Sequence, residues 1–214
     1  MGLLVSVVLA ILGAVMGVVA DRLATRWPEH DEEHPPGRAV DWRTAACALF
    51  GAVVLPLVAN RFGGDWLALA IFGAWFCSLV VGLATDLDQR LLPDLLTLPA
   101  IPVALLYAVS GQNPLVGAAL VGAILAAVVI PAVLYLPSIP FGAGAFGLGD
   151  VKFLIGMGLL LGFERSFGAI LVGLLTAGVV LLILLVTRRI GRRSYVPFGP
   201  FLIFGAMWAV LLRP

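Results

Sequence analysis

The stretch VKFLIGMGLLLGFERSFGAILVGLLTAGVVLLILLVT, residues 151–187, is almost wholly apolar and is divided by the charged residues Glu164 and Arg165. Its two runs show no alternation of apolar and polar residues, so they do not fit the strands of a membrane barrel. A backbone inside lipid satisfies its polar groups only in a helix or a closed barrel. The stretch therefore predicts two membrane helices, over residues 151–162 and 167–187.

The rest of the chain has the same character. Of its 214 residues, 62% are hydrophobic and 12% are charged, whereas soluble domains are about 45–50% apolar and about 25% charged. Further helices are predicted over residues 1–19, 44–60, 66–85, 94–110, 114–136 and 198–212. Residues 1–19 lack a basic n-region and are too long for a signal peptide, which favours a retained span. We expect an all-α fold, a polytopic membrane helix bundle of about eight transmembrane helices, with residues 1–214 as a single integral-membrane domain.

The distribution of basic residues predicts the orientation, because Lys and Arg accumulate in cytoplasmic loops. With the N-terminus outside, ten basic residues fall inside and three outside: Arg22, Arg26, Arg38, Arg43, Arg90, Lys152, Arg188, Arg189, Arg192 and Arg193 inside, and Arg61, Arg165 and Arg213 outside. This asymmetry predicts an N-out/C-out topology. The loops that carry Asp86, Asp88, Asp94 and Asp150 then face the cytoplasm.

Composition gives no sign of nucleic acid or of a metal centre. The net charge is only +1, and Cys47 and Cys77 lie in the middle of predicted helices, where they serve as small apolar side chains. His30 and His34 lie among acids in the loop 20–43. A metal site there is possible in principle, but a solvated acidic loop is favoured, so we predict no metal ligand.

Most acids have an ordinary explanation. Solvation accounts for Asp21, Glu29, Asp31, Glu32, Glu33 and Asp41 in and beside the first loop, and helix ends at the outer surface account for Asp65 and Glu164. Asp94 follows Pro93 at the start of a helix, where an acid interacts favourably with the helix dipole. Asp88 is expected to be solvated or paired with Arg90, and Asp86 ends the apolar run before it.

Asp150 is harder to explain. The run after it, residues 151–162, would make about 18 Å of helix, whereas the hydrocarbon core is about 30 Å thick. Asp150 is therefore expected below the inner surface, at a depth where an acid indicates function. Gly147 and Gly149 would allow positive φ and close backbone approach in the turn before it. Two acids that share one proton are able to activate water, as in aspartic proteases.

Four segments resemble the type IV prepilin peptidases, which are GxGD intramembrane aspartic proteases. They are ATDLDQRLLPDLLTLP (residues 84–99), FGLGDVKF (146–153), YVPFGPFLIFG (195–205) and GAVMGVVADRL (13–23). The resemblance implies Asp86 and Asp150 as the catalytic pair. The motifs also contain the supporting positions that we predict, Gly147, Gly149, Lys152, Asp88, Pro93, Asp94, Pro197 and Gly199.

The resemblance further implies an enzyme of the cytoplasmic (inner) membrane with its active site on the cytoplasmic side. Its substrates would be prepilin or pseudopilin precursors of type IV pili or secretion systems, cleaved after the glycine that ends a basic leader. Proteolysis of this kind needs no cofactor. Many members also methylate the product with S-adenosylmethionine and carry paired CxxC motifs, but the loop 20–43 has no cysteine, which leaves methylation open. Gly17 stands where the family commonly has asparagine.

Two alternative functions are compatible with these acids. One is a GxGD protease with a different transmembrane substrate, although the PAL motif expected of presenilins is missing. The other is a proton-coupled transporter that uses the acids as a relay. The transporter is disfavoured because the four acids cluster on one side and the sequence has no internal repeat.

Overall fold

The computed structural model describes residues 2–30, 36–141, 146–189, 191 and 196–211. Within these ranges the fold is all-helical, which confirms the predicted class. The elements are α1 (Leu3–Ala24), α2 (Trp42–Phe62), α3 (Trp66–Gln89), α4 (Asp94–Thr97), α5 (Ala100–Val109), α6 (Leu120–Tyr135), the 3₁₀ helix η1 (Leu136–Phe141), α7 (Leu148–Val186) and α8 (Gly199–Leu211).

Several of these helices are long enough to cross a bilayer. In the described part of the chain, α1, α2, α3, α7 and the segment Leu120–Pro140 have the length and hydropathy of membrane spans, and the segments Asp94–Val109 and Gly199–Leu211 are shorter and apolar. Large apolar side chains such as Leu4, Ile11 and Val186 are exposed on their outer faces, as expected of a lipid-facing surface. The number of spans and the N-out/C-out orientation stay predictions.

The helix α7 is folded back on itself. Gly162 has φ 73° and ψ 177°, which interrupts the helix. The Ser166 hydroxyl donates a hydrogen bond of 3.4 Å to the carbonyl of Met157, although nine residues of straight helix would span about 13 Å. The chain therefore reverses at Gly162, which agrees with the two separate helices predicted over 151–162 and 167–187.

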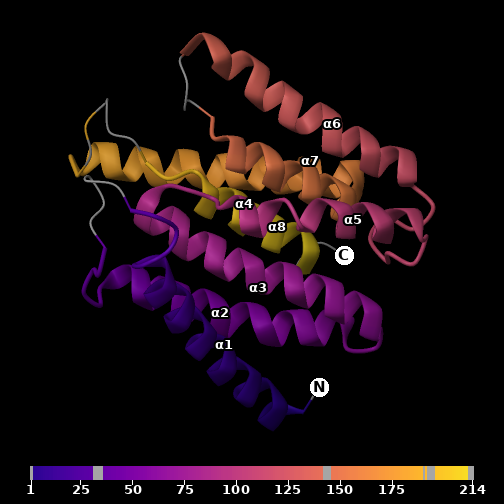
Figure 1. The fold of residues 1–214 in the computed structure, drawn as a ribbon, viewed down its shortest axis with the longest axis horizontal. Helices are drawn as coiled ribbons and strands as arrows, with labels where there is room; N and C mark the ends of the chain where they lie inside the picture. Colours follow the sequence, from indigo (N-terminus) through magenta and orange to yellow (C-terminus); the bar gives the residue numbers. More distant parts are fainter. Residues whose placement is uncertain (1, 31–35, 142–145, 190, 192–195, 212–214) are drawn as a thin grey trace.

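Several helix ends meet at one end of the bundle. Figure 1 shows that the α3–α4 link, the ends of α1 and α7 and the start of α2 lie on the left of the view, whereas the links α2–α3 and α5–α6 lie on the right. The first turn of α7 packs against the α3–α4 link. The segments that carry Asp86, Asp88, Asp94 and Asp150 are therefore at one end of the bundle, as the sequence predicted.

Several predicted boundaries are wrong. The first helix runs to Ala24 rather than residue 19, and α3 runs to Gln89 rather than residue 85. The predicted helix 94–110 is divided into α4 and α5 at Pro99, because proline cannot donate to the preceding turn. The predicted helix 114–136 begins only at Leu120, since Asn113 closes a turn by accepting a hydrogen bond from the N–H of Leu115.

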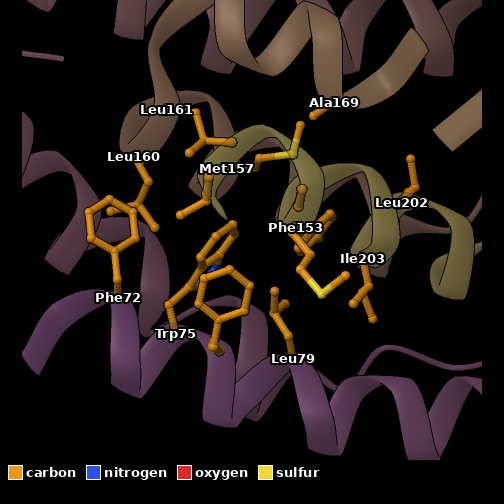
Figure 2. Close-up of a cluster of buried hydrophobic side chains, with 14 of the residues drawn as sticks. Phe72, Trp75, Leu79, Phe153, Met157, Leu160, Leu161, Ala169, Leu202 and Ile203 are labelled. Atoms are coloured by element: carbon orange, nitrogen blue, oxygen red, sulfur yellow. The ribbon is translucent and has the colours of Figure 1, made fainter. Parts of the chain in front are cut away.

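The core lies where α3, α7 and α8 meet. Figure 2 shows Phe72, Trp75 and Leu79 of α3 facing Phe153, Met157 and Leu160 of α7. The rings of Trp75 and Phe153 stack with centroids 6.2 Å apart. Leu202 and Ile203 of α8 close the cluster and are fully buried. This cluster fixes the three helices that supply the candidate site.

Small residues allow close helix contacts in the described part of the chain. A Cβ at Gly17 would lie 2.1 Å from the carbonyl oxygen of Cys47, and one at Gly13 would lie 2.0 Å from that of Gly51. The asparagine that the resemblance suggests at Gly17 therefore has no room against α2. Gly158 packs in the same way on Ala127 of α6, and Gly162 forms the reversal.

Candidate active site

A cavity of about 690 Å³ lies at the end of the bundle that carries the four acids. It is enclosed by the end of α3, the α3–α4 link, η1 and the start of α7. Its walls are formed by Asp86, Arg90, Leu91, Leu92, Asp94, Tyr135, Ser138, Ile139, Phe146, Gly147, Leu148, Gly149, Asp150 and Lys152. The structure thus brings Asp86 and Asp150, which are 64 positions apart in the sequence, into one cavity.

Asp86 lies in the last turn of α3 and is only 4% exposed. Its Oδ2 atom is buried and has no hydrogen-bond partner among the described residues. The first residue of α8 touches its carboxyl group, because a Cβ at Gly199 would lie 2.7 Å from the Asp86 Cγ. A helix N-terminus at this point favours negative charge. Gly199 is therefore needed for the approach of α8 to Asp86.

Asp150 lies in the first turn of α7. The two glycines before it do not use the positive φ that glycine allows, since Gly147 is extended with φ −68° and Gly149 is helical. Close approach is their role in the structure. A Cβ at Gly149 would lie 2.6 Å from the Leu92 carbonyl oxygen, and one at Gly147 would lie 3.2 Å from the Asp150 Oδ2.

The helix boundaries bear on the depth of the two acids. The sequence put Asp86 at the end of its helix and Asp150 before the next one, so that Asp86 was expected nearer the surface. In the structure α3 continues to Gln89 and α7 begins already at Leu148. Both acids are therefore inside helices, and each is about one turn from the end of its helix.

Asp94 and Lys152 face each other at the edge of the cavity. The Lys152 ammonium donates a hydrogen bond of 2.6 Å to the Asp94 carboxylate, and the Asp94 side chain is 59% exposed. Pro93 precedes α4 in extended conformation, and its carbonyl accepts the N–H of Leu96 at 3.0 Å. These residues link α4 to the start of α7, next to both aspartates.

Asp88 points away from the cavity, and its expected solvation or pairing with Arg90 is wrong. Arg38 Nε donates to its Oδ1 at 2.7 Å, Arg43 Nη1 donates to the same atom at 3.1 Å, and His30 Nε2 lies 3.3 Å from its Oδ2. Solvation is also wrong for Asp21, which is fully buried and accepts from Thr44 at 2.6 Å. Much of the loop 20–43 is thus tied to the helices.

Pro197 lies on a different hollow, of about 380 Å³, between the ends of α3 and α7 and the start of α8. The neighbouring Phe198 contacts Phe146, which lines the main cavity, with ring centroids 6.0 Å apart. The turn before α8 is therefore packed against the turn before α7. Sequence reasoning missed Leu92, Phe146 and Arg38, and the only signal for Leu92 and Phe146 was their place inside the two motifs.

The described residues hold no group of three histidine, cysteine or acidic side chains arranged for a metal ion. His30 is instead half of a polar pair with Asp88 and also lies 3.3 Å from the Gln89 side chain. His34 falls outside the described residues.

Fold and site together define a class: a polytopic membrane protein in which two aspartates from different helices face one cavity at the end of the bundle. The sequence profile of the type IV leader peptidase family matches residues 76–184, about half of the chain and the part that contains both aspartates. The chain therefore belongs to the type IV leader peptidase family.

Named relatives extend the similarity. Proteins called prepilin leader peptidase/N-methyltransferase are 32% identical over 145 residues in Burkholderia pseudomallei, 30% over 175 residues in Aeromonas salmonicida and 30% over 174 residues in Pseudomonas aeruginosa. These alignments cover 67%, 81% and 81% of this chain, and 46%, 59% and 59% of the relatives. The chain thus spans about half the length of the curated relatives it matches. No solved structure matches it significantly.

Proposed function

We propose that the chain is a membrane aspartic endopeptidase that removes the leader of prepilin-like or pseudopilin-like precursors, with Asp86 and Asp150 as the catalytic pair. The observation that carries the proposal is the cavity that both carboxyl groups line. Membership of the type IV leader peptidase family supports the reaction class. The names of the longer relatives support the substrate class.

The chemistry follows from two carboxyl groups that line one cavity, of which Asp86 is buried. Like charges at close range disfavour double ionisation, so the pair holds one proton. The ionised carboxylate takes a proton from a water molecule, whose oxygen attacks the scissile carbonyl carbon. The protonated partner hydrogen-bonds the carbonyl oxygen, and the intermediate collapses when the amide nitrogen gains a proton and leaves as an amine. The unpartnered Oδ2 of Asp86 is available for this exchange.

The walls of the cavity suit a junction between a polar and an apolar peptide segment. Leu91, Ile139 and Phe146 offer apolar contacts, whereas the acids Asp86, Asp94 and Asp150 suit a basic segment. A leader cleavage site has this character, since a polar basic leader meets an apolar helix there. We propose that cleavage follows the leader glycine, and that the cavity opens to the cytoplasmic side of the cytoplasmic membrane.

Proteolysis by two aspartates requires no cofactor, and we propose none for this step. The relatives' names join leader peptidase to N-methyltransferase. Methyl transfer in this chain would need S-adenosylmethionine in addition, and the cysteine-free loop 20–43 leaves that second activity open.

The test is cleavage of a prepilin by membranes that contain the full chain. Asp86→Asn and Asp150→Asn keep the side-chain volume and are each expected to reduce cleavage to background, with insertion into the membrane unchanged. Asp65→Asn is the matched control, because Asp65 caps the opposite end of α3 by accepting from the N–H groups of Leu67 and Ala68, and asparagine also caps. Wild-type rates in either site variant would remove that residue from the pair.

The mass and N-terminal sequence of the product decide between the proposed function and its alternatives. A product that starts after the leader glycine supports the proposal, and extra mass of one methyl group would reveal methylation. Cleavage inside the apolar helix would instead indicate a GxGD protease with another substrate. Proton-coupled transport that depends on Asp86, without any cleavage, would favour the transporter.

A further inference from the structure

A single guanidinium joins three helices beside the candidate site. Arg38 donates from Nη2 to the Asp21 Oδ1 at 2.5 Å, from Nη1 to Asp41, and from Nε to the Asp88 Oδ1 at 2.7 Å. Asp21 belongs to α1, Asp41 is the N-cap of α2, and Asp88 is in the last turn of α3. Each nitrogen that can donate outward thus has its own carboxylate, and the carboxylates come from three different helices.

The centre of the cluster is buried, its outer members Arg22, Asp41 and Arg43 are 34%, 33% and 30% exposed, and the cluster is close to neutral. The side chains of Asp21, Asp88 and Arg38 are 0%, 6% and 17% exposed. Arg22 and Arg43 add two more positive charges, so three arginines face three aspartates. Burial alone would lower the pKa of the Arg38 guanidinium, but its hydrogen bonds to Asp88 and Asp21 outweigh burial and raise that pKa above its ordinary value. Arg38 therefore stays charged wherever the protein is folded.

The same turn of α3 that carries Asp88 also carries Asp86. Residues two apart on a helix point in directions about 200° apart, so Asp86 faces the cavity while Asp88 faces the loop 20–43. The neighbouring Gln89 side chain also reaches that loop segment, donating to the carbonyls of Ala24 and Pro28 at 3.4 Å. One side of the α3 end is thus bound to the loop 20–43, whereas the opposite side carries Asp86 toward the cavity.

The helix end needs such support. It stops at Arg90, which has φ 57° and closes the last turn by donating its N–H to the Asp86 carbonyl at 2.9 Å. Helix ends open easily unless side chains fix them. On its other side Asp86 meets the start of α8 at Gly199, so a small movement of the turn would change its position against both α8 and Asp150.

We propose that Arg38 is a positioning residue for the cleavage reaction: by binding Asp88 together with Asp21 and Asp41, it holds the last turn of α3 so that Asp86 faces Asp150. The proposal rests on the proposed function for its effect on cleavage. Lysine cannot replace Arg38, because an ammonium is a point charge without the planar fork that serves three acids in fixed directions.

The test compares Arg38→Lys with Arg22→Lys in the full chain in membranes or detergent. Arg22 belongs to the same cluster and donates to Asp21, to Thr44 and to the Arg38 carbonyl, but it does not bond to α3. Amide hydrogen exchange of residues 86–90 directly measures how often the end of α3 opens. We expect Arg38→Lys to speed exchange there by about tenfold or more, and Arg22→Lys to leave it near the wild-type rate.

The kinetics of prepilin cleavage are the second measurement. Arg38→Lys should lower kcat by up to about a hundredfold with KM nearly unchanged, since a catalytic group displaced by about 1 Å loses that much. It should also change the shape of the pH profile of kcat, whereas a mere loss of folded protein scales the whole profile down. If Arg38→Lys does not fold, Asp88→Asn weakens the same link, leaves the bonds to Asp21 and Asp41, and should act in the same direction.

The outcomes separate the two proposals. Unchanged exchange at residues 86–90 in both Arg38→Lys and Asp88→Asn would overturn the positioning role, whatever the activity. A raised KM with unchanged kcat would overturn it too, because Arg38 would then serve substrate binding. A wild-type chain that cleaves no prepilin would refute the proposed function, and the exchange measurement would still decide whether Arg38 holds the α3 end.

Discussion

Gly149→Ala adds one methyl group at the tightest contact between the two halves of the candidate site. Its Cβ would lie 2.6 Å from the Leu92 carbonyl oxygen and 2.9 Å from the Leu92 Cβ, whereas ordinary contact begins at 3.4 Å. The start of α7 must therefore move about 0.8 Å away from the α3–α4 link. A displacement of about 1 Å at a catalytic group costs up to about a hundredfold in rate, and overpacking costs about 1–3 kcal/mol.

We therefore expect Gly149→Ala to lower kcat for prepilin cleavage by about ten- to a hundredfold, with the protein still inserted and folded. Initial rates against a purified prepilin and thermal unfolding in detergent measure the two effects. Gly156→Ala is the matched control, because Gly156 lies on the same arm of α7 and its added Cβ would meet only the Ala100 Cβ at 3.9 Å. Equal rates in Gly149→Ala and Gly156→Ala would refute the argument that this close approach places Asp150.

Three further variants test other contacts. Gly199→Ala would put a Cβ 2.7 Å from the Asp86 Cγ, so we expect kcat for prepilin cleavage to fall at least about tenfold. An unchanged rate would show that α8 does not constrain Asp86. Gly162→Ala should lower the free energy of unfolding by about 1–3 kcal/mol, because φ 73° with ψ 177° is a backbone region almost restricted to glycine. Unchanged denaturant unfolding in detergent would contradict the sharp reversal. Lys152→Met should change stability by less than about 1 kcal/mol, since its ion pair with Asp94 is largely exposed, and high salt should erase even that difference; a large loss of stability at every salt concentration would contradict this.

The sequence predicted the architecture well where chemistry is local. Apolar runs define membrane helices because lipid leaves the backbone no other solution, and the break between residues 162 and 167 was visible in the charged pair Glu164–Arg165. The α3 boundary was missed because Asp86 and Asp88 look like a polar loop after an apolar run. In the structure both belong to the last turn of α3, where an arginine 50 positions away binds Asp88, and no local pattern encodes such a partner.

The candidate site was predictable in part for the same reason. The two motifs pointed to Asp86 and Asp150, and the structure brings both to one cavity. Asp88 was expected to be solvated or paired with Arg90. In the structure it binds Arg38 on the side of α3 opposite to Asp86. Which side of a helix end meets which loop depends on packing between distant segments. Of the two properties that glycine allows at Gly147 and Gly149, positive φ and close approach, the structure uses only close approach, and sequence does not distinguish them.

The contact between Gly199 and Asp86 has a consequence for the timing of activity during synthesis. Gly199 follows Asp150 by 49 residues, so both aspartates are made well before the residue that closes on Asp86. On the proposed function, a nascent or truncated chain that ends before α8 would carry both acids in the membrane with the pocket unfinished. Such a chain would be unable to cut neighbouring membrane proteins, and the protease would become competent only when α8 inserts.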